Sequence, residues 1–568
     1  MIKASRMPDA DALLEVKNLR IAFAGDDPFE AVKDISFSLA KGATLAIVGE
    51  SGSGKSLTAL ALMGLLPKGA ALSGHIELHT GTDNFSLQSF SRNSWQQYRG
   101  KAAGIVFQEP MSALNPVMTI GAQLAESITA HKSLSKKEQR ALLQQWLENV
   151  QLTPTLADRF PHQLSGGQKQ RVMIAIAMCQ QPALVIADEP TTALDVTVQA
   201  EVLALMRSLQ QKFGTGYLFI THDLALAAEF ADEVLVLYKG ETVEYGAAKE
   251  VLLQPAHPYT QALIACRPAS HKKGERLPVV NDFLSGNYLV HSKSIQPVTP
   301  QKSSGIPAEK ILEVNGLEVW YPQKGKEPFK AVNSVSFNLM RGEILGLAGE
   351  SGCGKSTLGK ALMGLTPISG GSILFHGKNI SKLDRAGWKA IRRSMQLIFQ
   401  DPFSSLNPRL TIGESILEPM VIHKLAKPPE AREELSRLLD AVGLPADAAK
   451  RYPHQFSGGQ RQRIGIARAL ALKPQVLVCD ESVSALDVSV QAQILNLLKD
   501  LQHDFGLTYL FISHDLGVMR YLCDRIMIMQ AGRIVETGST EDVMQRPTHP
   551  YTQKLLSAIP AFAGSTQL

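Results

Sequence analysis

The sequence predicts an α/β protein built from two tandem copies of one domain, each with a mainly parallel core sheet. Two observations support this fold class: almost the whole chain repeats itself, and short apolar runs alternate with helical stretches in each copy. Continuous apolar strands separated by helices are typical of a sheet that is buried on both faces. In the first copy we expect strands at Thr44–Val48, Ala183–Ala187 and Tyr217–Thr221, and helices between Ile120 and Phe160.

Length and composition exclude several classes of protein. The chain has 568 residues, of which 45% are hydrophobic and 20% charged, values that exclude a disordered or fibrous protein. Lys and Arg exceed Asp and Glu by only five (58 against 53), which gives no argument for a nucleic-acid partner. The five cysteines are odd in number and widely spaced, so neither a disulfide framework nor a zinc site is expected.

Membrane-spanning and export signals are not expected. The longest run of uncharged apolar residues, Val172–Cys179, is too short to cross a bilayer. The first residues lack the apolar core and cleavage site of a signal peptide. We therefore expect a chain that stays in the cytoplasm and reaches a membrane only through partners.

The two copies are related by a nearly constant shift along the chain. The motif GESGSGKS begins at Gly49 and returns as GESGCGKS at Gly349, 300 residues later. The later motifs, from FQEP to HPYTQ, return after 292 residues, so the first copy has eight extra residues, which we expect between Gly74 and Ser91. Between the copies lies a stretch rich in Pro, Ser, Gly and Lys that has little core of its own. We predict one domain over residues 13–268, a linker over 269–309 and a second domain over 310–558.

Each copy contains a Gly-rich loop of the form GxxxxGK[ST], from Gly49 to Ser56 and from Gly349 to Ser356. Each loop follows an expected strand and opens an expected helix, Leu57–Leu66 or Thr357–Leu365. In this context, the glycines let backbone N–H groups turn toward a phosphate, and the helix N-terminus adds partial positive charge. A single match could be an ordinary turn, but two matches at corresponding positions favour two nucleotide sites.

The loop residues divide the work of binding a nucleotide with Mg²⁺. The lysine reaches the β and γ phosphates, and the serine after it can ligate the metal. The expected nucleotide-binding residues of the loops are Gly49, Ser51, Gly52, Ser53, Gly54, Lys55, Ser56 and Leu57, and Gly349, Ser351, Gly352, Cys353, Gly354, Lys355, Ser356 and Thr357.

An acid pair ends an apolar strand in each copy. Asp188 and Asp480 are expected in the Mg²⁺ shell, together with Ser56 and Ser356. The next residue would point to the other side of the strand, because side chains alternate faces. This arrangement leaves one carboxylate for the metal and one, Glu189 or Glu481, as the base for the attacking water.

A glutamine and a histidine complete each expected hydrolytic site. Gln108 and Gln400 follow apolar runs, and a neutral amide can touch both metal and water without adding charge. His222 and His514 end the strand after the acid pair, where they could donate a hydrogen bond to a γ-phosphate. A histidine after a strand is often structural, so the paired context is what favours a catalytic role.

The segments LSGGQ, from Leu164, and FSGGQ, from Phe456, complete a pattern that resembles the ATP-binding cassette superfamily. The resemblance covers both copies. It implies P-loop ATPase domains, each with an antiparallel β subdomain and a helical subdomain beside the core sheet, and ATP hydrolysis with Mg²⁺. In this family the SGGQ segment opens a helix that faces the nucleotide of the opposite domain, and a helix N-terminus is a suitable anion site. The segments are Ser165, Gly166, Gly167 and Gln168, and Ser457, Gly458, Gly459 and Gln460.

The resemblance therefore implies two composite sites. The first would join Lys55, Ser56, Gln108, Glu189 and His222 with Ser457 to Gln460, and the second would join Lys355, Ser356, Gln400, Glu481 and His514 with Ser165 to Gln168. Phe23 and Tyr321 would be the aromatic residues that stack on adenine, and Asp195 and Asp487 would lie in the loops that cross between domains. The departures from the family pattern, Phe456 for Leu and Ser482 for Pro, remove no catalytic atom, so two active sites are expected.

A finer resemblance concerns the segments PAHPYTQALI and PTHPYTQKLL near the end of each copy. They are similar to the oligopeptide/dipeptide/nickel importer subfamily, especially its fused two-cassette members. Some members bind an iron–sulfur cluster after this motif, but only Cys266 lies there, so no cluster is expected. The implied function is the energy-coupling ATPase of an importer for peptides or peptide-like solutes. Its implied partners are two integral-membrane permeases and, indirectly, an extracytoplasmic binding protein, and its implied place is the cytoplasmic face of the inner membrane.

Two other functions compete with this one. Twin-cassette ATPases that act on ribosomes or DNA usually have a long charged helical linker or inserted domains, whereas this linker is rich in Pro and Ser. An exporter cassette is disfavoured by the HPYT motif.

Overall fold

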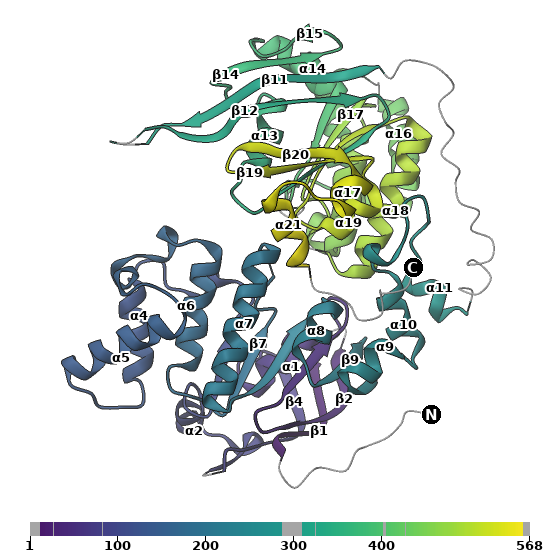
Figure 1. The fold of residues 1–568 in the computed structure, drawn as a ribbon. Coiled ribbons are helices and arrows are strands. Elements are labelled where there is room, and N and C mark those ends of the chain that lie inside the picture. The colour runs from purple at the N-terminus through teal and green to yellow at the C-terminus, as the bar shows by residue number, and fades with distance from the viewer. Residues whose placement is uncertain are drawn as a thin grey trace. The chain divides into compact units, whose positions relative to one another are not determined.

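The computed structural model describes residues 12–25, 28–81, 83–192, 194–286, 309–323, 325, 327–401, 405–425, 428–484 and 486–559 (Figure 1). These residues form two compact units. The first contains the described residues up to Ile264 together with Val280–Gly286, and the second contains Ala265–Val279 together with the described residues from 309 to Ile559. Residues 287–308 of the expected linker lie outside the described residues.

The core sheet of the first unit has six strands in the order β10-β9-β3-β8-β7-β6. Neighbouring strands are parallel from β9 to β6, and β10 at the edge is antiparallel to β9. The central strands β3, β7 and β8 are buried at every position, which confirms the expectation of a sheet covered on both faces. The strands are β3 (Thr44–Val48), β6 (Ala103–Val106), β7 (Leu184–Asp188), β8 (Gly216–Thr221), β9 (Glu233–Tyr238) and β10 (Glu241–Ala247).

A second, antiparallel sheet of the first unit has the order β2-β1-β4-β5. Apolar side chains of β1 and β2 join those of β3 and of the helix after the Gly-rich loop in one buried cluster. This cluster anchors both ends of the Gly-rich loop in a closely packed core. The strands are β1 (Ala12–Phe23), β2 (Phe29–Ala40), β4 (Ala70–His79) and β5 (Asn84–Ser86).

Helices of the first unit begin where the sequence supplies caps. Ser135 and Glu138 form a capping box at the start of α5, and Ser165 and Gln168 form one at the start of α6. α4 and α5 confirm the helices expected between Ile120 and Phe160. The helices are α1 (Lys55–Leu62), α2 (Arg92–Tyr98), α3 (Pro110–Ala113), α4 (Ile120–Thr129), α5 (Lys136–Asn149), α6 (Gly166–Met178), α7 (Val196–Phe213), α8 (Leu224–Phe230), α9 (Ala248–Leu253), α10 (Pro258–Ala265) and α11 (Val280–Leu284).

The second unit repeats this architecture. Its core sheet has the order β16-β17-β18-β13-β19-β20, and its antiparallel sheet has the order β12-β11-β14-β15. The strands are β11 (Lys310–Tyr321), β12 (Phe329–Met340), β13 (Ile344–Ala348), β14 (Gly370–Phe375), β15 (Lys378–Asn379), β16 (Met395–Ile398), β17 (Val476–Asp480), β18 (Thr508–Ile512), β19 (Arg525–Gln530) and β20 (Arg533–Ser539). The helices are α13 (Lys355–Leu362), α14 (Arg385–Ser394), α15 (Ile412–Ile422), α16 (Pro428–Ala441), α17 (Gly458–Leu470), α18 (Val488–Phe505), α19 (Leu516–Leu522), α20 (Thr540–Gln545) and α21 (Pro550–Ser557).

The eight extra residues of the first copy lie only partly between Gly74 and Ser91, where they were expected. Leu78 of β4 pairs with Leu14 as Phe375 of β14 pairs with Leu312, a shift of 297 residues, so three of the eight lie before Gly74. β4 has ten residues, whereas its counterpart β14 has six, and the turn that follows β4 is also longer. The insertion thus extends the antiparallel sheet and leaves the core sheet unchanged.

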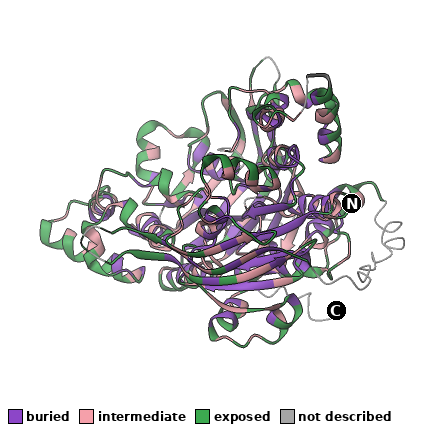
Figure 2. Ribbon diagram, turned by 90° about the horizontal axis from the view of Figure 1, so that it is seen from above, coloured by how far each residue is buried: buried purple, intermediate pink, exposed green. Residues whose placement is uncertain are grey.

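Burial follows the sheets in both units. Figure 2 shows the buried residues concentrated in the strands, with exposed residues on the surrounding helices. Among the described helices, none combines the length and the apolar character that a membrane span requires. All five cysteines are free thiols in buried positions.

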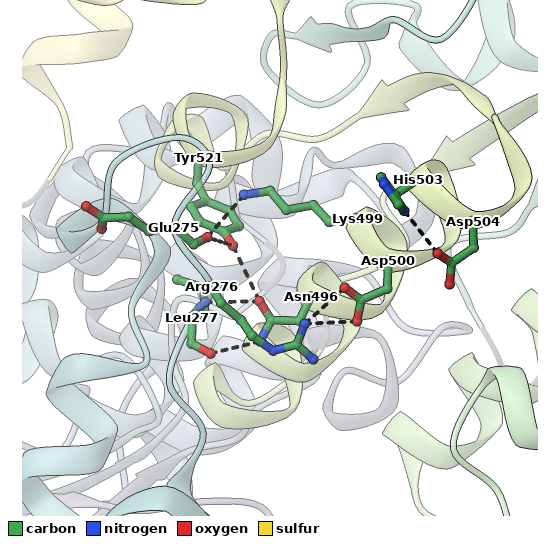
Figure 3. Close-up of polar contacts among 9 residues, drawn as sticks. All are labelled: Glu275, Arg276, Leu277, Asn496, Lys499, Asp500, His503, Asp504 and Tyr521. Carbon is green, nitrogen blue, oxygen red and sulfur yellow. Dashed lines mark hydrogen bonds and ion pairs between the residues drawn. The ribbon is translucent and has the colours of Figure 1, made fainter. Parts of the chain in front are cut away.

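Residues 265–279, which we call the strap, pack on α18 and α19 of the second unit (Figure 3). The Asn496 side chain accepts a hydrogen bond from the backbone N–H of Leu277 (3.0 Å) and donates one to the Leu277 carbonyl (2.8 Å). The Tyr521 hydroxyl donates to the Glu275 carbonyl at 2.7 Å. Because Asn496 and Leu277 are both buried, these bonds satisfy polar backbone groups that have left water.

Charged side chains lie beside the hydrogen bonds that Asn496 and Tyr521 make with the strap backbone. The Arg276 guanidinium contacts both carboxylate oxygens of Asp500, at 2.9 and 3.0 Å, and Lys273 donates to the Asp524 carboxylate. The Lys499 ammonium lies 3.5 Å from the centroid of the Tyr521 ring. Burial, together with the nearby positive charge of Lys273, lowers the pKa of Lys499 to about 8.

The first unit has no matching surface at the equivalent positions. At the shift of 292 residues, Asn496, Asp500 and Tyr521 correspond to Ala204, Ser208 and Glu229. The polar groups that hold the strap are therefore specific to the second unit.

Asn496→Ala is expected to loosen the strap. The change leaves the Leu277 N–H and carbonyl without their partner, at a cost of about 1–2 kcal/mol. We expect tryptic cleavage after Lys273 and Arg276 to become roughly 5- to 30-fold faster, because slow cleavage tracks the population of the opened segment. Limited proteolysis of the full chain followed by mass spectrometry measures this rate.

Asp500→Ala is the matched control for this prediction. It removes an ion pair whose side chains are about half exposed, and such pairs contribute roughly 0–1 kcal/mol. Cleavage after Lys273 should then increase by no more than about fivefold. A wild-type cleavage rate in Asn496→Ala would contradict the role given to the Asn496 amide.

Candidate active sites

Each Gly-rich loop holds its lysine against the loop backbone. The Lys55 ammonium donates to the carbonyls of Gly49 and Glu50, both at 2.8 Å. In the second unit, Lys355 donates to the carbonyls of Gly349 and Glu350 at 2.7 and 2.9 Å. Both lysine side chains are buried, so the loop carbonyls replace the water that the charge would otherwise need. The ammonium is thus preorganised within the loop that would bind a phosphate.

The first glycine of each loop is required by both backbone geometry and space. Gly49 has φ of 153°, and a Cβ atom there would lie 2.2 Å from the Leu237 carbonyl oxygen. Gly349 has φ of 154°, and its Cβ would lie 2.3 Å from the Met529 carbonyl oxygen. A side chain at either position would force the loop away from the end of β9 or β19.

The serine and aspartate that we expect to bind the metal lie in contact in both units. The Ser56 hydroxyl donates to the Asp188 carboxylate at 3.1 Å, and the Ser356 hydroxyl donates to Asp480 at 2.9 Å. A hydroxyl and a carboxylate this close, next to a phosphate loop, are an oxygen donor set of the kind that Mg²⁺ takes together with water and phosphate oxygens. Burial raises the pKa of Asp188 to about 6 and also raises that of Asp480, and the neighbouring Glu adds to both shifts. A bound divalent cation would reverse this effect by favouring the ionised carboxylates.

The expected catalytic glutamates take a backbone conformation that the sequence did not predict. We expected Glu189 and Glu481 to face away from the aspartates because side chains alternate along a strand. The strands end at Asp188 and Asp480, and both glutamates follow with φ of 46°, in the left-handed region. This conformation is strained for a residue with a side chain, and the Glu189 N–H donates to the Ile220 carbonyl at 2.9 Å to hold it.

Glu189 is the meeting point of the expected side chains in the first unit. Its Oε2 atom accepts hydrogen bonds from the Gln108 amide at 3.0 Å and from the Thr192 hydroxyl at 2.8 Å. Its Oε1 atom lies 3.2 Å from Nδ1 of His222. The carboxylate is therefore held from both of its oxygen atoms.

Glu481 has nearly the same surroundings in the second unit. The Gln400 amide donates to its Oε2 atom at 2.7 Å, and Nδ1 of His514 lies 3.6 Å from its Oε1 atom. The residue at the position of Thr192 is Ser484, whose hydroxyl donates instead to the backbone carbonyl of Glu481 at 2.9 Å. The second glutamate thus lacks the hydroxyl contact that the first receives from Thr192.

The histidines favour the ionised form of these glutamates. Burial by itself would raise the pKa of Glu189 and Glu481. The contact with His222 or His514 and the charge of the loop lysine, joined at Glu189 by the Thr192 hydroxyl, together outweigh burial and lower both pKa values. For His514, burial would lower the pKa, but the contact with Glu481, together with the charge of Asp515, outweighs it and raises the value. Each glutamate is therefore kept ionised, as a general base requires.

The SGGQ segments begin helices as expected. The Ser165 hydroxyl accepts from the Gln168 N–H at 3.3 Å, while the Gln168 side chain accepts from the Ser165 N–H at 3.0 Å, and Ser457 and Gln460 repeat this capping box. The second glycine has a packing role that the motif did not indicate. A Cβ atom at Gly167 would lie 2.5 Å from Val198, and one at Gly459 would lie 2.2 Å from Val490.

The remaining expected residues lie at element boundaries. Phe23 ends β1 and packs, partly buried, against the core cluster of the first unit, whereas Tyr321 ends β11 with 42% of its surface exposed. Asp195 and Asp487 are the N-cap residues of α7 and α18. Their expected parts in nucleotide stacking and domain crossing stay predictions.

The structure also shows contacts that the sequence did not predict. Thr192 was not singled out, although it stands three residues after Glu189 in DEPTT. The tyrosines of the two HPYT motifs, Tyr259 and Tyr551, contact the Gly-rich loops through their hydroxyl groups. The repetition of HPYTQ in both copies was the signal that could have found them.

The family models agree with this geometry. The model described as "ABC transporter" matches residues 32–192 and 332–484, and the model described as "Oligopeptide/dipeptide transporter, C-terminal region" matches residues 243–282 and 535–568.

Curated relatives extend the agreement over nearly the full chain. The Glutathione import ATP-binding protein GsiA of Escherichia coli O157:H7 is 48% identical over 572 residues, which cover 98% of this chain and 91% of the relative. The proteins of the same name from Escherichia coli (strain K12) and Shigella boydii serotype 4 (strain Sb227) are each 47% identical with the same coverage. With two P-loop sites, two SGGQ helices and two copies of the C-terminal motif, the chain belongs to the ATP-binding cassette transporter family, as a two-cassette importer ATPase that uses ATP and Mg²⁺.

Proposed function

We propose that this chain powers the import of short peptides and peptide-like solutes, glutathione among them, by hydrolysing ATP at two sites that each need residues of both cassettes. The observation that carries the proposal is the duplication of the lysine–loop, serine–aspartate and glutamine–glutamate hydrogen bonds of Lys55, Ser56 and Glu189 at Lys355, Ser356 and Glu481. Each cassette holds a copy of every residue type to which we assign a part in hydrolysis.

The chain's residues divide the chemistry within each site. The loop lysine neutralises phosphate charge, and the serine and aspartate would hold Mg²⁺, which would offset further negative charge on the phosphates. The glutamate accepts the proton of the attacking water. The glutamine and the histidine orient the glutamate, since both contact its carboxylate, and the histidine also favours its ionised form.

The SGGQ helices support the composite character of the sites. A helix N-terminus carries partial positive charge and N–H groups that no helix carbonyl accepts from, and both suit a γ-phosphate. We propose that Ser457 to Gln460 complete the site of Lys55, and that Ser165 to Gln168 complete the site of Lys355. Phe23 and Tyr321 are proposed to stack on adenine, and Asp195 and Asp487 to report the state of one site to the other.

Membrane permeases and a substrate-binding protein are the partners of an importer ATPase. We propose two permease subunits, one for each cassette, and a position on the cytoplasmic face of the inner membrane. The alternative of an ATPase that acts on ribosomes or DNA is not favoured, because the curated relatives are import proteins. Glutathione is proposed because those relatives bear it in their names, and because it is itself a peptide-like solute.

Glu189→Gln combined with Glu481→Gln is expected to bind ATP and barely hydrolyse it. The amide preserves the shape of the side chain but cannot accept the proton of water, and a positioned base contributes about 10²- to 10⁴-fold in rate. Steady-state phosphate release and equilibrium ATP binding measure the two properties on the same protein. Near-normal phosphate release would refute the assignment of the glutamates.

Ser165→Arg tests which SGGQ segment serves which loop. The Glu189→Gln, Glu481→Gln background retains a photoreactive ATP analogue without hydrolysing it. After photolabelling, each labelled peptide is assigned to the loop of Lys55 or the loop of Lys355. We expect labelling of the peptide that contains Lys355 to fall by at least about tenfold, because the arginine blocks the helix N-terminus. Ser457→Arg is the matched control and should reduce labelling of the Lys55 peptide. The reverse pattern would overturn the composite assignment.

Uptake of glutathione tests the proposed solute. Cells that lack this chain should lose ATP-dependent accumulation of radiolabelled glutathione and regain it with the wild-type gene but not with the double glutamine variant. A labelled dipeptide and Ni²⁺ serve as competing candidates in the same cells. Unchanged glutathione uptake, with loss of dipeptide or Ni²⁺ uptake, would retain the ATPase and reject glutathione.

A further inference from the structure

The tyrosine of each HPYT motif reaches the Gly-rich loop of its own cassette. The Tyr259 hydroxyl accepts a hydrogen bond from the Glu50 N–H at 3.1 Å, and the Tyr551 hydroxyl accepts one from the Glu350 N–H at 3.1 Å. Both side chains are buried, with 0% and 7% of their surface exposed. The partners are 209 and 201 residues apart in sequence, so each contact joins the end of a cassette to its nucleotide loop.

The peptide group held by each tyrosine is the same one that holds the loop lysine. The Glu50 N–H and the Gly49 carbonyl belong to one planar peptide group and point in opposite directions. The N–H donates to Tyr259, while the carbonyl accepts from Lys55 at 2.8 Å. In the second cassette, Tyr551 and Lys355 take the two ends of the peptide between Gly349 and Glu350. Hydrogen bonds in such a chain polarise and strengthen one another.

This peptide needs an external support because of where it lies. Gly49 and Gly349 adopt φ values near 150°, which only glycine tolerates well. Because glycine has no side chain, steric contacts of a side chain do not fix the orientation of the peptide plane that follows it. Rotation of the plane would turn the carbonyl away from the lysine and the N–H into the space of its neighbours. The tyrosine hydroxyl accepts a hydrogen bond from the N–H end of this peptide, while the lysine donates to its carbonyl end. The tyrosine therefore opposes the rotation.

The rest of the motif holds the tyrosine in place. In the first cassette, Glu244 of β10 accepts from the N–H groups of Ala256 and His257 at 2.9 and 3.2 Å, and Nδ1 of His257 accepts from the Tyr259 N–H at 3.1 Å. Proline follows the histidine at the first position of α10, where no N–H is needed. Histidine, proline and tyrosine therefore form one bracket from β10 to the loop.

The second cassette repeats this bracket. Glu536 of β20 accepts from the N–H groups of Thr548 and His549 at 2.8 and 3.2 Å, and Nδ1 of His549 accepts from the Tyr551 N–H at 3.2 Å. Burial would raise the pKa of Glu536, but the hydrogen bonds from Thr548 and its neighbours outweigh it and lower the value. The carboxylate is thus stabilised in the ionised form that accepts these bonds.

We propose that Tyr259 and Tyr551 are positioning residues of the two ATP sites, which fix the peptide that presents the loop lysine to the nucleotide. The HPYT motif is then a support for the ATPase centre. The inference rests on the ATPase activity of the family and is independent of the transported solute.

Tyr259→Phe combined with Tyr551→Phe tests the proposal in the full chain. Phenylalanine keeps the buried ring and removes only the hydroxyl, so the fold is retained. We expect the affinity for a non-hydrolysable ATP analogue and the kcat/KM for ATP to fall about 5- to 10-fold, the effect of losing one buried hydrogen bond. Isothermal titration and steady-state phosphate release measure the two quantities.

A matched control removes buried tyrosine hydroxyls that do not touch the loops. Tyr217 and Tyr509 occupy equivalent places in β8 and β18, and their hydroxyls contact the carbonyls of Met206 and Leu498. Tyr217→Phe with Tyr509→Phe should lower thermal stability while leaving affinity for the analogue within about twofold. An equal loss of affinity in this control would mean that any weakened core impairs binding, and would overturn the proposal.

A double-mutant cycle that combines the tyrosine and lysine substitutions distinguishes positioning of the lysine from general support of the fold. If the tyrosine acts through the lysine, removing its hydroxyl in a Lys55→Ala, Lys355→Ala background should change analogue affinity by less than about twofold. Competition against a fluorescent nucleotide at millimolar concentration reads the weaker affinities. The same 5- to 10-fold loss in both backgrounds, or no loss in either, would overturn the proposal.

Discussion

Each cassette depends on the ability of a short stretch of backbone to hold a highly charged triphosphate. Backbone N–H groups can converge on an anion only if the chain adopts conformations that side chains would block, which is why the loops begin with Gly49 and Gly349. Such a loop has little internal stiffness. The buried strand before it, the helix after it and the folded-back lysine give it a defined shape, and the core clusters secure both anchoring elements.

The two cassettes share their reactive groups and differ around them. The lysine–loop, serine–aspartate and glutamine–glutamate hydrogen bonds occur in both units, with distances that agree within a few tenths of an ångström. Around this common set, Ser53 is replaced by Cys353, Thr192 by Ser484, and the polar residues that hold the strap are found in the second unit alone. Duplication has therefore preserved the geometry of hydrolysis while the surroundings became unequal.

Much of the fold followed from pattern, because buried parallel strands are continuous apolar runs and Thr44–Val48 was predicted to the residue. The groups around Asp188 and Glu189 were predicted because their motifs end neighbouring strands of one sheet. The left-handed backbone of Glu189 was missed, since alternation of faces applies only inside a strand. The contact of Tyr259 with the loop was missed because it spans 209 residues, and the strap because Asn496 recognises backbone atoms, which have no sequence pattern.

The strap also determines how this gene can be divided. A polypeptide that starts at the visible beginning of the second repeat, near Lys310, would omit Ala265–Val279 and leave the Asn496 amide and the apolar seat of Leu277 uncovered. A polypeptide of the first half that includes the strap and stops before Gly286 would carry a segment that packs on the second unit, and the second unit belongs to the other fragment. A single cut therefore cannot respect both units: a cut upstream of Ala265 keeps the strap with the second unit but removes Val280–Gly286 from the first, and a cut after Gly286 does the reverse.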